Sequence, residues 1–213
     1  MKIISHRGYW LNVGEKNTLR AFERSFEHGF GTETDIRDSL GRLVISHDIP
    51  SGKEQEFAEF LACAESATND NNPLTLALNI KADGLAQILT KELAKTSQLD
   101  CFVFDMAIPD MRQYLAQGIP VFTRMSEVER HPAYLDEAAG VWLDAFVNEW
   151  YDNSIIQTLM NLGKRVCIVS PELHGRPYLN QWDRLSVWGH TEQVILCTDK
   201  PEEANVYFEK FLL

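Results

Sequence analysis

Residues 2–37, KIISHRGYWLNVGEKNTLRAFERSFEHGFGTETDIR, combine an apolar run, an amphipathic run and a second apolar run. The amphipathic part, residues 17–29, places Leu19, Phe22 and Phe26 on one face at helical spacing. Asn17 or Thr18 can cap its start, and Gly29 ends it. The stretch therefore predicts a strand, a helix and a second strand, which is the βαβ unit of a parallel sheet.

The same alternation continues through all 213 residues. Strand candidates cover residues 2–6, 32–37, 74–81, 101–106, 120–124, 140–146, 165–170 and 194–198. Further helical patterns cover residues 83–96, 109–118, 153–164 and 202–213. Eight strands with intervening helices predict an α/β fold, a (β/α)₈ TIM barrel near the short end of its size range, as a single domain over residues 1–213. The alternative is an open doubly wound sheet, but no glycine-rich phosphate loop follows the first strand.

Composition limits the partners. The formal net charge of −11 disfavours binding to nucleic acid and to anionic membrane surfaces, because like charges repel. No apolar run approaches the roughly 20 residues of a transmembrane segment. The chain passes from Met1 directly into strand-like residues without a signal peptide, and its four cysteines lack metal-type spacing. These features predict a cytoplasmic protein with reduced cysteines.

Polar residues follow the predicted strands, where the active site of a (β/α)₈ barrel lies. The set comprises His6, Arg7, Glu33, Asp35, Asn79, Lys81, Asp105, Arg124, Asp144, Ser170 to Glu172, Thr198 and Asp199. Side chains alternate along a strand, so Asn79 and Lys81 share the face opposite Leu78 and Ile80. We therefore expect Asn79 and Lys81 to point into the barrel.

Glu33 and Asp35 also share one strand face, where their charges repel and lose hydration. They need basic neighbours or a cation. In the simpler interpretation, Arg7, Arg37 or Lys81 only pairs with them. In the other, their oxygens bind a hard divalent cation, Mg²⁺ or Ca²⁺. Histidines on either side, His6 and His47, can transfer protons near neutral pH. Together with Arg7 and Lys81, this set favours phosphoryl-group chemistry.

These residues resemble a known signature. His-Arg-Gly at 6–8, Asn-Thr at 17–18, Glu-x-Asp at 33–35 and His-Asp at 47–48 are similar in order and spacing to the N-terminal motifs of the glycerophosphodiester phosphodiesterases. That family lies within the phosphatidylinositol-phospholipase-C-like superfamily. The likeness is strong over residues 3–48, fair at residues 78–81 and 195–204, and weak between them.

The resemblance implies a metal-dependent phosphodiesterase. By position, His6 and His47 form the acid–base pair, Glu33 and Asp35 bind the metal, and Arg7 and Lys81 hold the phosphate. A hydroxyl beside the phosphoester attacks phosphorus, and water opens the resulting cyclic intermediate. His6 is expected to act as base and His47 as acid in the first step.

The chain departs from the family at several positions. Asn79 stands where the family has a third metal-binding glutamate, and Lys16 stands where it has a glutamate. Two compensations are open. Another acid from the same mouth could replace the missing carboxylate, with Glu172 preferred over Asp105 and Asp144, or Asn79 is a weak ligand and water completes a weak site. Residues 50–54 replace a longer insert after the second strand, which suggests a wider mouth.

The substrate and a second function remain open at this point. A small-molecule or polymeric phosphodiester fits a wide mouth, for example a glycerol-phosphate or sugar-phosphate polymer or a lipid headgroup. The alternative function is a degenerate barrel that binds a phosphorylated ligand without turnover. His174 and His190 could rim the mouth, and Trp182 and Trp188 fall in the segment 174–190, a long connection of the kind that often carries specificity. The sequence does not set the oligomeric state.

Overall fold

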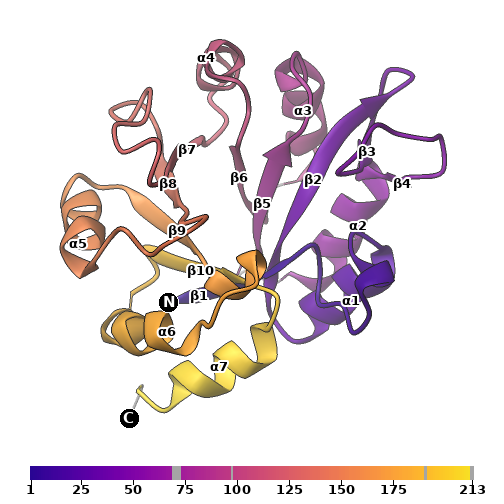
Figure 1. The fold of residues 1–213 in the computed structure, drawn as a ribbon. Helices are drawn as coiled ribbons and strands as arrows, with labels where there is room; N and C mark the ends of the chain where they lie inside the picture. Colours follow the sequence, from indigo (N-terminus) through magenta and orange to yellow (C-terminus); the bar gives the residue numbers. More distant parts are fainter. Residues whose placement is uncertain (69–72, 97, 190, 212–213) are drawn as a thin grey trace. The chain divides into compact units, whose positions relative to one another are not determined.

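The computed structural model describes residues 1–68, 73–96, 98–189 and 191–211. The chain divides into two compact units, one formed by Ser5–Val121 and the other by Met1–Ile4 together with Phe122–Leu213. Figure 1 shows the elements of both units along the chain. The prediction of a single domain is not tested by this division.

All eight predicted strands are present. They are β1 (Lys2–His6), β2 (Gly31–Ser39), β5 (Thr75–Ile80), β6 (Asp100–Phe104), β7 (Phe122–Met125), β8 (Gly140–Leu143), β9 (Arg165–Val169) and β10 (Val194–Thr198). The five predicted helices also form, as α1 (Leu19–Glu27), α3 (Ala86–Leu93), α4 (Ile108–Ala116), α5 (Asn153–Asn161) and α7 (Pro201–Glu209). The last helix is shorter than predicted, and residues 212–213 lie outside the described residues.

Several elements were not predicted. They are β3 (Arg42–Ile45), β4 (Gln55–Glu56), α2 (Phe57–Ala67), α6 (Leu179–Leu185) and three short 3₁₀ helices, η1 (Val13–Glu15), η2 (Pro171–His174) and η3 (Ser186–Trp188). The signal for α2 was present in the sequence, because Phe57, Phe60, Leu61 and Ala64 have helical spacing and are buried.

Trp182, in the long segment that was expected to carry specificity, lies in the core. Trp182 lies on α6, is fully buried, and contacts Phe208 of α7 at a ring distance of 5.8 Å. Burying this large apolar ring in the core stabilises the fold, whereas exposing it to solvent at the mouth would not. Trp188 is partly buried and packs against the hydrophobic core that contains Trp182. His190 lies outside the described residues.

In the unit Ser5–Val121, the central strand is β2. It pairs in parallel with β5, which in turn pairs in parallel with β6. On continuing past the parallel region, β2 turns back through Leu40 and Gly41 and pairs antiparallel with β3. Asp35 lies opposite Asn79 in the register of β2 and β5. This register brings Asp35 and Asn79 together near the carboxyl end of the parallel pairing of β2 with β5.

Helices α1 and α2 pack against each other in this unit. The Thr18 hydroxyl accepts a hydrogen bond from the Ala21 amide and so caps α1. The apolar face of α1 is buried, and Phe22 meets Phe60 of α2 edge to face at 4.7 Å. Because α1 is anchored in this way, the loop between β1 and α1 has a fixed end.

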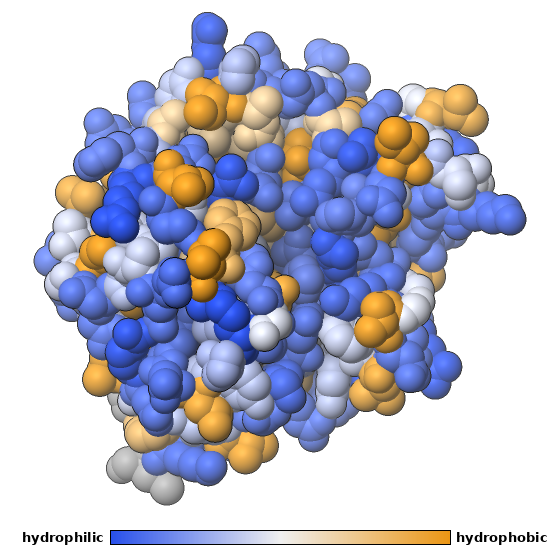
Figure 2. Space-filling model, in the orientation of Figure 1, coloured by the Kyte–Doolittle hydropathy of each residue, from blue (hydrophilic) through white to orange (hydrophobic). Residues whose placement is uncertain are grey.

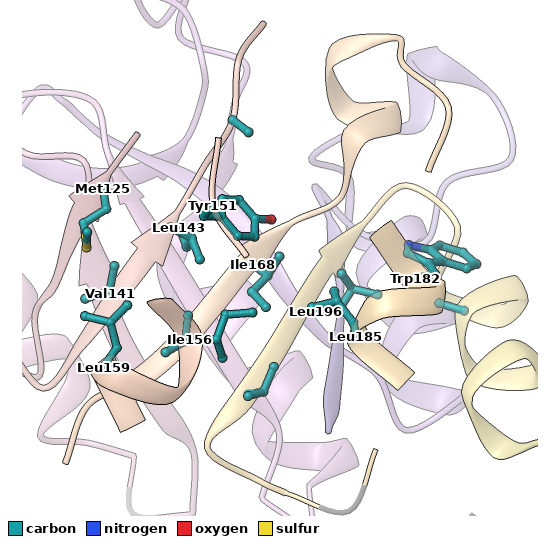
Figure 3. Packing of buried hydrophobic residues seen from close by; sticks show 14 of the residues in the cluster. Met125, Val141, Leu143, Tyr151, Ile156, Leu159, Ile168, Trp182, Leu185 and Leu196 are labelled. Atoms are coloured by element: carbon teal, nitrogen blue, oxygen red, sulfur yellow. The ribbon is translucent and has the colours of Figure 1, made fainter. Parts of the chain in front are cut away.

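In the other unit, β7, β8, β9 and β10 form a parallel sheet in that order. Its core holds side chains from β8, β9 and β10 together with Ile156 and Leu159 of α5 and Leu185 of α6 (Figure 3). The strand residues are β-branched or aliphatic, which suits strands covered by helices.

The surface matches the acidic, polar composition. On the face shown in Figure 2, hydrophobic residues stand singly or in small groups among hydrophilic ones. Such scattered exposure is ordinary for a folded protein. None of the helices in the described part of the chain has the length and apolar character needed to cross a bilayer.

Candidate active site

His6 is the last residue of β1, and Arg7 and Gly8 begin the loop that follows. Arg7 has a positive φ of 61°, and its amide donates to the Glu33 carbonyl at 2.9 Å. Gly8 has φ +85°, and a Cβ there would lie 2.7 Å from the Ala21 Cβ. The sequence therefore needs glycine at this position, because the chain passes tightly against α1 in a left-handed conformation.

Glu33 and Asp35 lie on the same side of β2 and are buried, with 2% and 0% of their surface exposed. Asp35 accepts a hydrogen bond from Asn17 Nδ2 at 2.8 Å. It also forms ion pairs with Arg7 Nε at 2.9 Å and Lys81 Nζ at 3.4 Å. Arg7 and Lys81 thus both lie beside Asp35, as the simpler interpretation of the acid pair anticipated, whereas Arg37 donates to the His47 carbonyl.

Asn79 lies on β5 and is 7% exposed. Its amide nitrogen donates to Glu33 Oε1 at 3.3 Å, so its side chain faces the acid pair. Burial raises the pKa of Glu33 to about 7, and repulsion by Asp35 adds to the rise, while His6, Arg7 and Lys81 oppose it. The neutral amide of Asn79 spares the site a third negative charge.

The two predicted histidines have different surroundings. His6 Nε2 lies 3.9 Å from Glu33 Oε2. The His47 side chain is 48% exposed, and its Nδ1 lies 2.9 Å from Asp48 Oδ1. The structure therefore places His6 directly against the acid pair and His47 on the adjoining surface of the same unit.

Asn17 is a site residue whose contacts were not predicted. It is not the helix cap. Its backbone has φ 60° and its amide donates to the Arg7 carbonyl, while its side-chain oxygen accepts from Thr34 Oγ1 at 2.9 Å. With its bond to Asp35, Asn17 ties the His-Arg-Gly loop to β2. The sequence signal that could have revealed this role was the Asn-Thr pair: only Thr18 is needed to cap α1, so Asn17 was left without an explanation.

Three oxygens of this cluster are suited to a metal ion. Among the residues that the structure describes, no hydrogen bond is donated to the buried atoms Glu33 Oε2, Asp35 Oδ1 and Asn79 Oδ1, although Asp35 Oδ1 has its ion pair with Lys81. Buried oxygens normally have a hydrogen-bond partner, so these three need an explanation. Two carboxylate oxygens and an amide oxygen are a donor set that fits a hard divalent cation. Within the described ranges, no group of three or more His, Cys, Asp or Glu side chains is arranged for a metal.

Glu172 has different contacts. It lies in η2 of the other unit, where its Oε1 accepts from Thr198 Oγ1 and the Asp199 amide and its Oε2 accepts from Ser170 Oγ. Nearby in that unit, His174 Nε2 lies 2.7 Å from Asp144 Oδ1. The role of Glu172 as a metal ligand stays a prediction, and its hydrogen bonds favour a structural role.

No family model and no curated protein matches the chain. Solved structures do. A glycerophosphodiester phosphodiesterase from Agrobacterium tumefaciens is similar with a TM-score of 0.72 and 13% identity, over 98% of this chain and 99% of that one. Further structures of glycerophosphodiester phosphodiesterases are also similar.

A Ca²⁺-dependent phosphatidylinositol-specific phospholipase C from Streptomyces antibioticus has a TM-score of 0.60 and 15% identity, over 97% of this chain and 96% of that one. A dihydropteroate synthase from Anaplasma phagocytophilum has a TM-score of 0.58 and 12% identity, over 99% of this chain and 98% of that one. These likenesses confirm the predicted fold class, the α/β (β/α)₈ barrel of the phosphodiesterase structures. Because enzymes of another class share the fold, the chemistry must be argued from the site.

Proposed function

We propose that this protein is a metal-dependent phosphodiester hydrolase of the glycerophosphodiester phosphodiesterase type. The observation that carries the proposal is the cluster in one unit of His6, Arg7, Glu33, Asp35 and Lys81, in which each of the two acids has a buried oxygen without a hydrogen bond. Hard oxygen ligands, two fixed cations and a histidine suit transfer of a phosphoryl group.

Arg7 and Lys81 would hold the phosphate. Both are about a fifth exposed, and Asp35 holds their charged ends in place at the buried acid pair. A chain with a net charge of −11 repels anions at long range, so a phosphodiester needs such a local positive site. The planar guanidinium of Arg7 can also donate two hydrogen bonds to one phosphate.

Glu33, Asp35 and Asn79 would hold a divalent cation, Mg²⁺ or Ca²⁺. When bound, the cation would neutralise negative charge on the reacting phosphate. The three ligand atoms come from adjacent strands whose pairing sets their relative positions. Asn79 contributes no formal charge, so the site should bind the cation less tightly than three carboxylates would.

His6 and His47 would move the protons. A hydroxyl of the substrate next to the phosphoester attacks phosphorus and gives its proton to His6. The bond from phosphorus to the leaving oxygen breaks, and His47 supplies the proton that this oxygen takes. A proton on His47 Nδ1, shared with Asp48, leaves Nε2 for this transfer. Water then opens the cyclic product, and the two histidines exchange roles.

The alternative function is binding of a phosphorylated ligand without turnover. It is favoured by the pairing of both Arg7 and Lys81 with Asp35 and by the neutral Asn79. With Glu33 and Asp35 ionised, two negative and two positive charges already balance. Such a site could hold a phosphate while lacking a strong metal site.

An assay with a panel of diesters tests the proposal. The panel should include glycerophosphocholine, glycerophosphoglycerol, a poly(glycerol phosphate) and a phosphatidylinositol, each with Mg²⁺, with Ca²⁺ and with chelator. We expect release of glycerol 3-phosphate or a free alcohol only with metal. Full turnover by metal-free protein in excess chelator would overturn the metal requirement. Calorimetric binding of the diesters without turnover would support the alternative.

The expected cytoplasmic location belongs to the same proposal, and cell fractionation checks it.

A further inference from the structure

A pocket of about 380 Å³ lies in the unit Ser5–Val121. It is lined by Lys16, Asn17, Thr18, Ile45, Ser46, His47, Asp48, Lys53, Glu54 and Gln55. Small-molecule sites have volumes of roughly 300–1,000 Å³, so this pocket can hold a sugar-sized or glycerol-sized group.

The pocket shares residues with the candidate active site. His47 lines it, and Asn17 lines it as well as donating to Asp35 Oδ2 at 2.8 Å. Asp35 in turn contacts Arg7 and Lys81, which would hold the phosphate. A phosphodiester has two alcohol arms. One arm of a diester bound at Arg7 is therefore within reach of this pocket, on the side of the histidine proposed to protonate the leaving oxygen.

The pocket carries two lysines, Lys16 and Lys53. The Lys16 ammonium lies over the Trp10 ring at 4.5 Å from its centroid, which restricts where the charge can point. Lys53 lies within the segment 50–54 and is exposed. These two residues supply positive charge that a ligand in the pocket can contact.

The pocket also contains two acids, Asp48 and Glu54, so its formal charges cancel. Both carboxylates are already engaged. Glu54 accepts hydrogen bonds from Ser51 Oγ and the Gly52 amide, each at 2.8 Å, and Asp48 Oδ1 contacts His47 Nδ1. The Ser51 backbone bond and its neighbours lower the pKa of Glu54 to about 2. Both acids keep their formal negative charge, but these contacts are within their own loop, and each lysine has a flexible stem and three N–H donors with which its ammonium can contact an anionic ligand.

We infer that this pocket takes the leaving arm of the diester and favours an arm with a second negative charge, such as a phosphorylated or carboxylated alcohol. Lys16 and Lys53 would be the specificity-determining residues. The inference rests on the proposed function and names the substrate class for the same site. It concerns only the leaving arm, because the attacking hydroxyl belongs to the other arm.

Three diesters with the same attacking arm test it. They are glycerophosphoglycerol, the same compound phosphorylated on its leaving glycerol, and glycerophosphocholine, whose leaving arm is cationic. The wild type is compared with Lys16→Gln, Lys53→Gln and the double variant. Lys91→Gln is the matched control, because it removes an equal charge from the exposed surface of α3 in the same unit. Binding is measured separately by calorimetry in the His6→Ala background.

We expect kcat/KM for the anionic arm to exceed that for the neutral arm about tenfold at low salt, and to fall about 5- to 10-fold in the double variant. The Lys91→Gln control should leave turnover of all three diesters within about twofold, and the pocket-lysine variants should lower turnover of the neutral arm less than that of the anionic arm. Equal turnover of all three diesters, with no effect of the lysine changes, would overturn the inference and leave the proposed function standing. Absence of turnover and of binding for every diester would overturn the proposed function itself.

Discussion

Two sets of strand ends in this molecule carry similar residues and differ in how those residues are bonded. Near the carboxyl end of the parallel pairing of β2 with β5, Glu33, Asp35 and Asn79 each keep a buried oxygen that accepts no hydrogen bond from the described part of the chain. At the ends of β9 and β10, Glu172 accepts from Ser170, Thr198 and the Asp199 amide. We call the first set the open site, because its buried oxygens still lack a hydrogen-bond donor, and the second the closed set, because Glu172 is held by its own hydrogen bonds.

The difference shows what separates a candidate active site from structural polar groups on the same fold. An acid at the carboxyl end of a barrel strand is suggestive, because active sites of this fold lie there. A bonded acid such as Glu172 stabilises neighbouring strands, and it would lose those bonds on binding a metal. A buried oxygen without a hydrogen bond has a desolvation cost that a bound cation would offset.

The largest expected effect distinguishes His6 from His174. His6→Ala and His47→Ala should each lower turnover of the best diester by at least about 10²-fold, because each removes a proton-transfer group. His174→Ala, in the same unit as the closed set, should change turnover by less than about threefold, since His174 contacts Asp144 and not the acid pair. Steady-state kinetics with a folding check by circular dichroism measure this.

The double variant His6→Ala/His47→Ala should lose less than the product of the single losses, because both act on one transfer. A His174→Ala variant as slow as His6→Ala would erase the contrast between the two regions. Near-wild-type turnover in His6→Ala would make that histidine structural.

The next effect tests the backbone of the open site. Gly8→Ala should lower the free energy of unfolding by about 2–3 kcal/mol, because it adds both a clash with Ala21 and strain at a positive φ. Gly41→Ala is the matched control, since Gly41 has φ +80° but open space where an added Cβ would lie. It should cost only about 1 kcal/mol. Urea unfolding of both variants gives the difference, and equal losses would show that the loop does not press on α1.

The pKa of Glu33 leads to a pH-dependent prediction. A folded-state pKa of about 7, above the ordinary 4.5, means that ionising Glu33 destabilises the metal-free fold. The stability that the fold has with Glu33 protonated is therefore fully present below about pH 4.5 and is lost as the pH rises through 7. Without metal, Glu33→Gln should match the wild type at pH 4.5 and exceed its unfolding free energy by about 1–3 kcal/mol at pH 8.

Chemical unfolding in chelator at several pH values measures this difference. Added Mg²⁺ or Ca²⁺ at pH 8 should stabilise the wild type and have little effect on Glu33→Gln. Parallel pH profiles for the two proteins in chelator would show that Glu33 titrates normally. A metal-induced rise of equal size in both would exclude Glu33 as a ligand.

The smallest expected effect concerns metal affinity. Asn79→Glu should tighten binding of Mg²⁺ or Ca²⁺ by about 1–2 kcal/mol, because it restores a negative charge beside Glu33 and Asp35. Glu172→Gln should leave this affinity unchanged and lower stability by about 1 kcal/mol, as expected for a lost acceptor in a bonded network. Calorimetric titration decides both. Loss of metal binding in Glu172→Gln would show that Glu172 is a metal ligand, and that its hydrogen-bonded network belongs to the site.

Much of the fold follows from local sequence. Apolar runs such as residues 74–81, separated by amphipathic runs with caps such as Thr18, predicted eight of the observed strands and five helices, because periodicity and capping are properties of neighbouring residues. Helix α2 was missed although Phe57, Phe60, Leu61 and Ala64 have the required spacing. Helix α6 was missed because its burial depends on Trp182 packing against α7, a contact that sequence spacing does not reveal.

For the site, the sequence by itself determined the residue types and their place at strand ends, including His6, Arg7, Glu33, Asp35 and Lys81. Only the tertiary structure decided which of them meet. It showed that Asn17 joins Asp35, that Arg7 and Lys81 share the same acid, and that Glu172 is bonded within another network. The physical reason is that hydrogen bonds and ion pairs between strands depend on register and burial, which arise only when distant segments pack together.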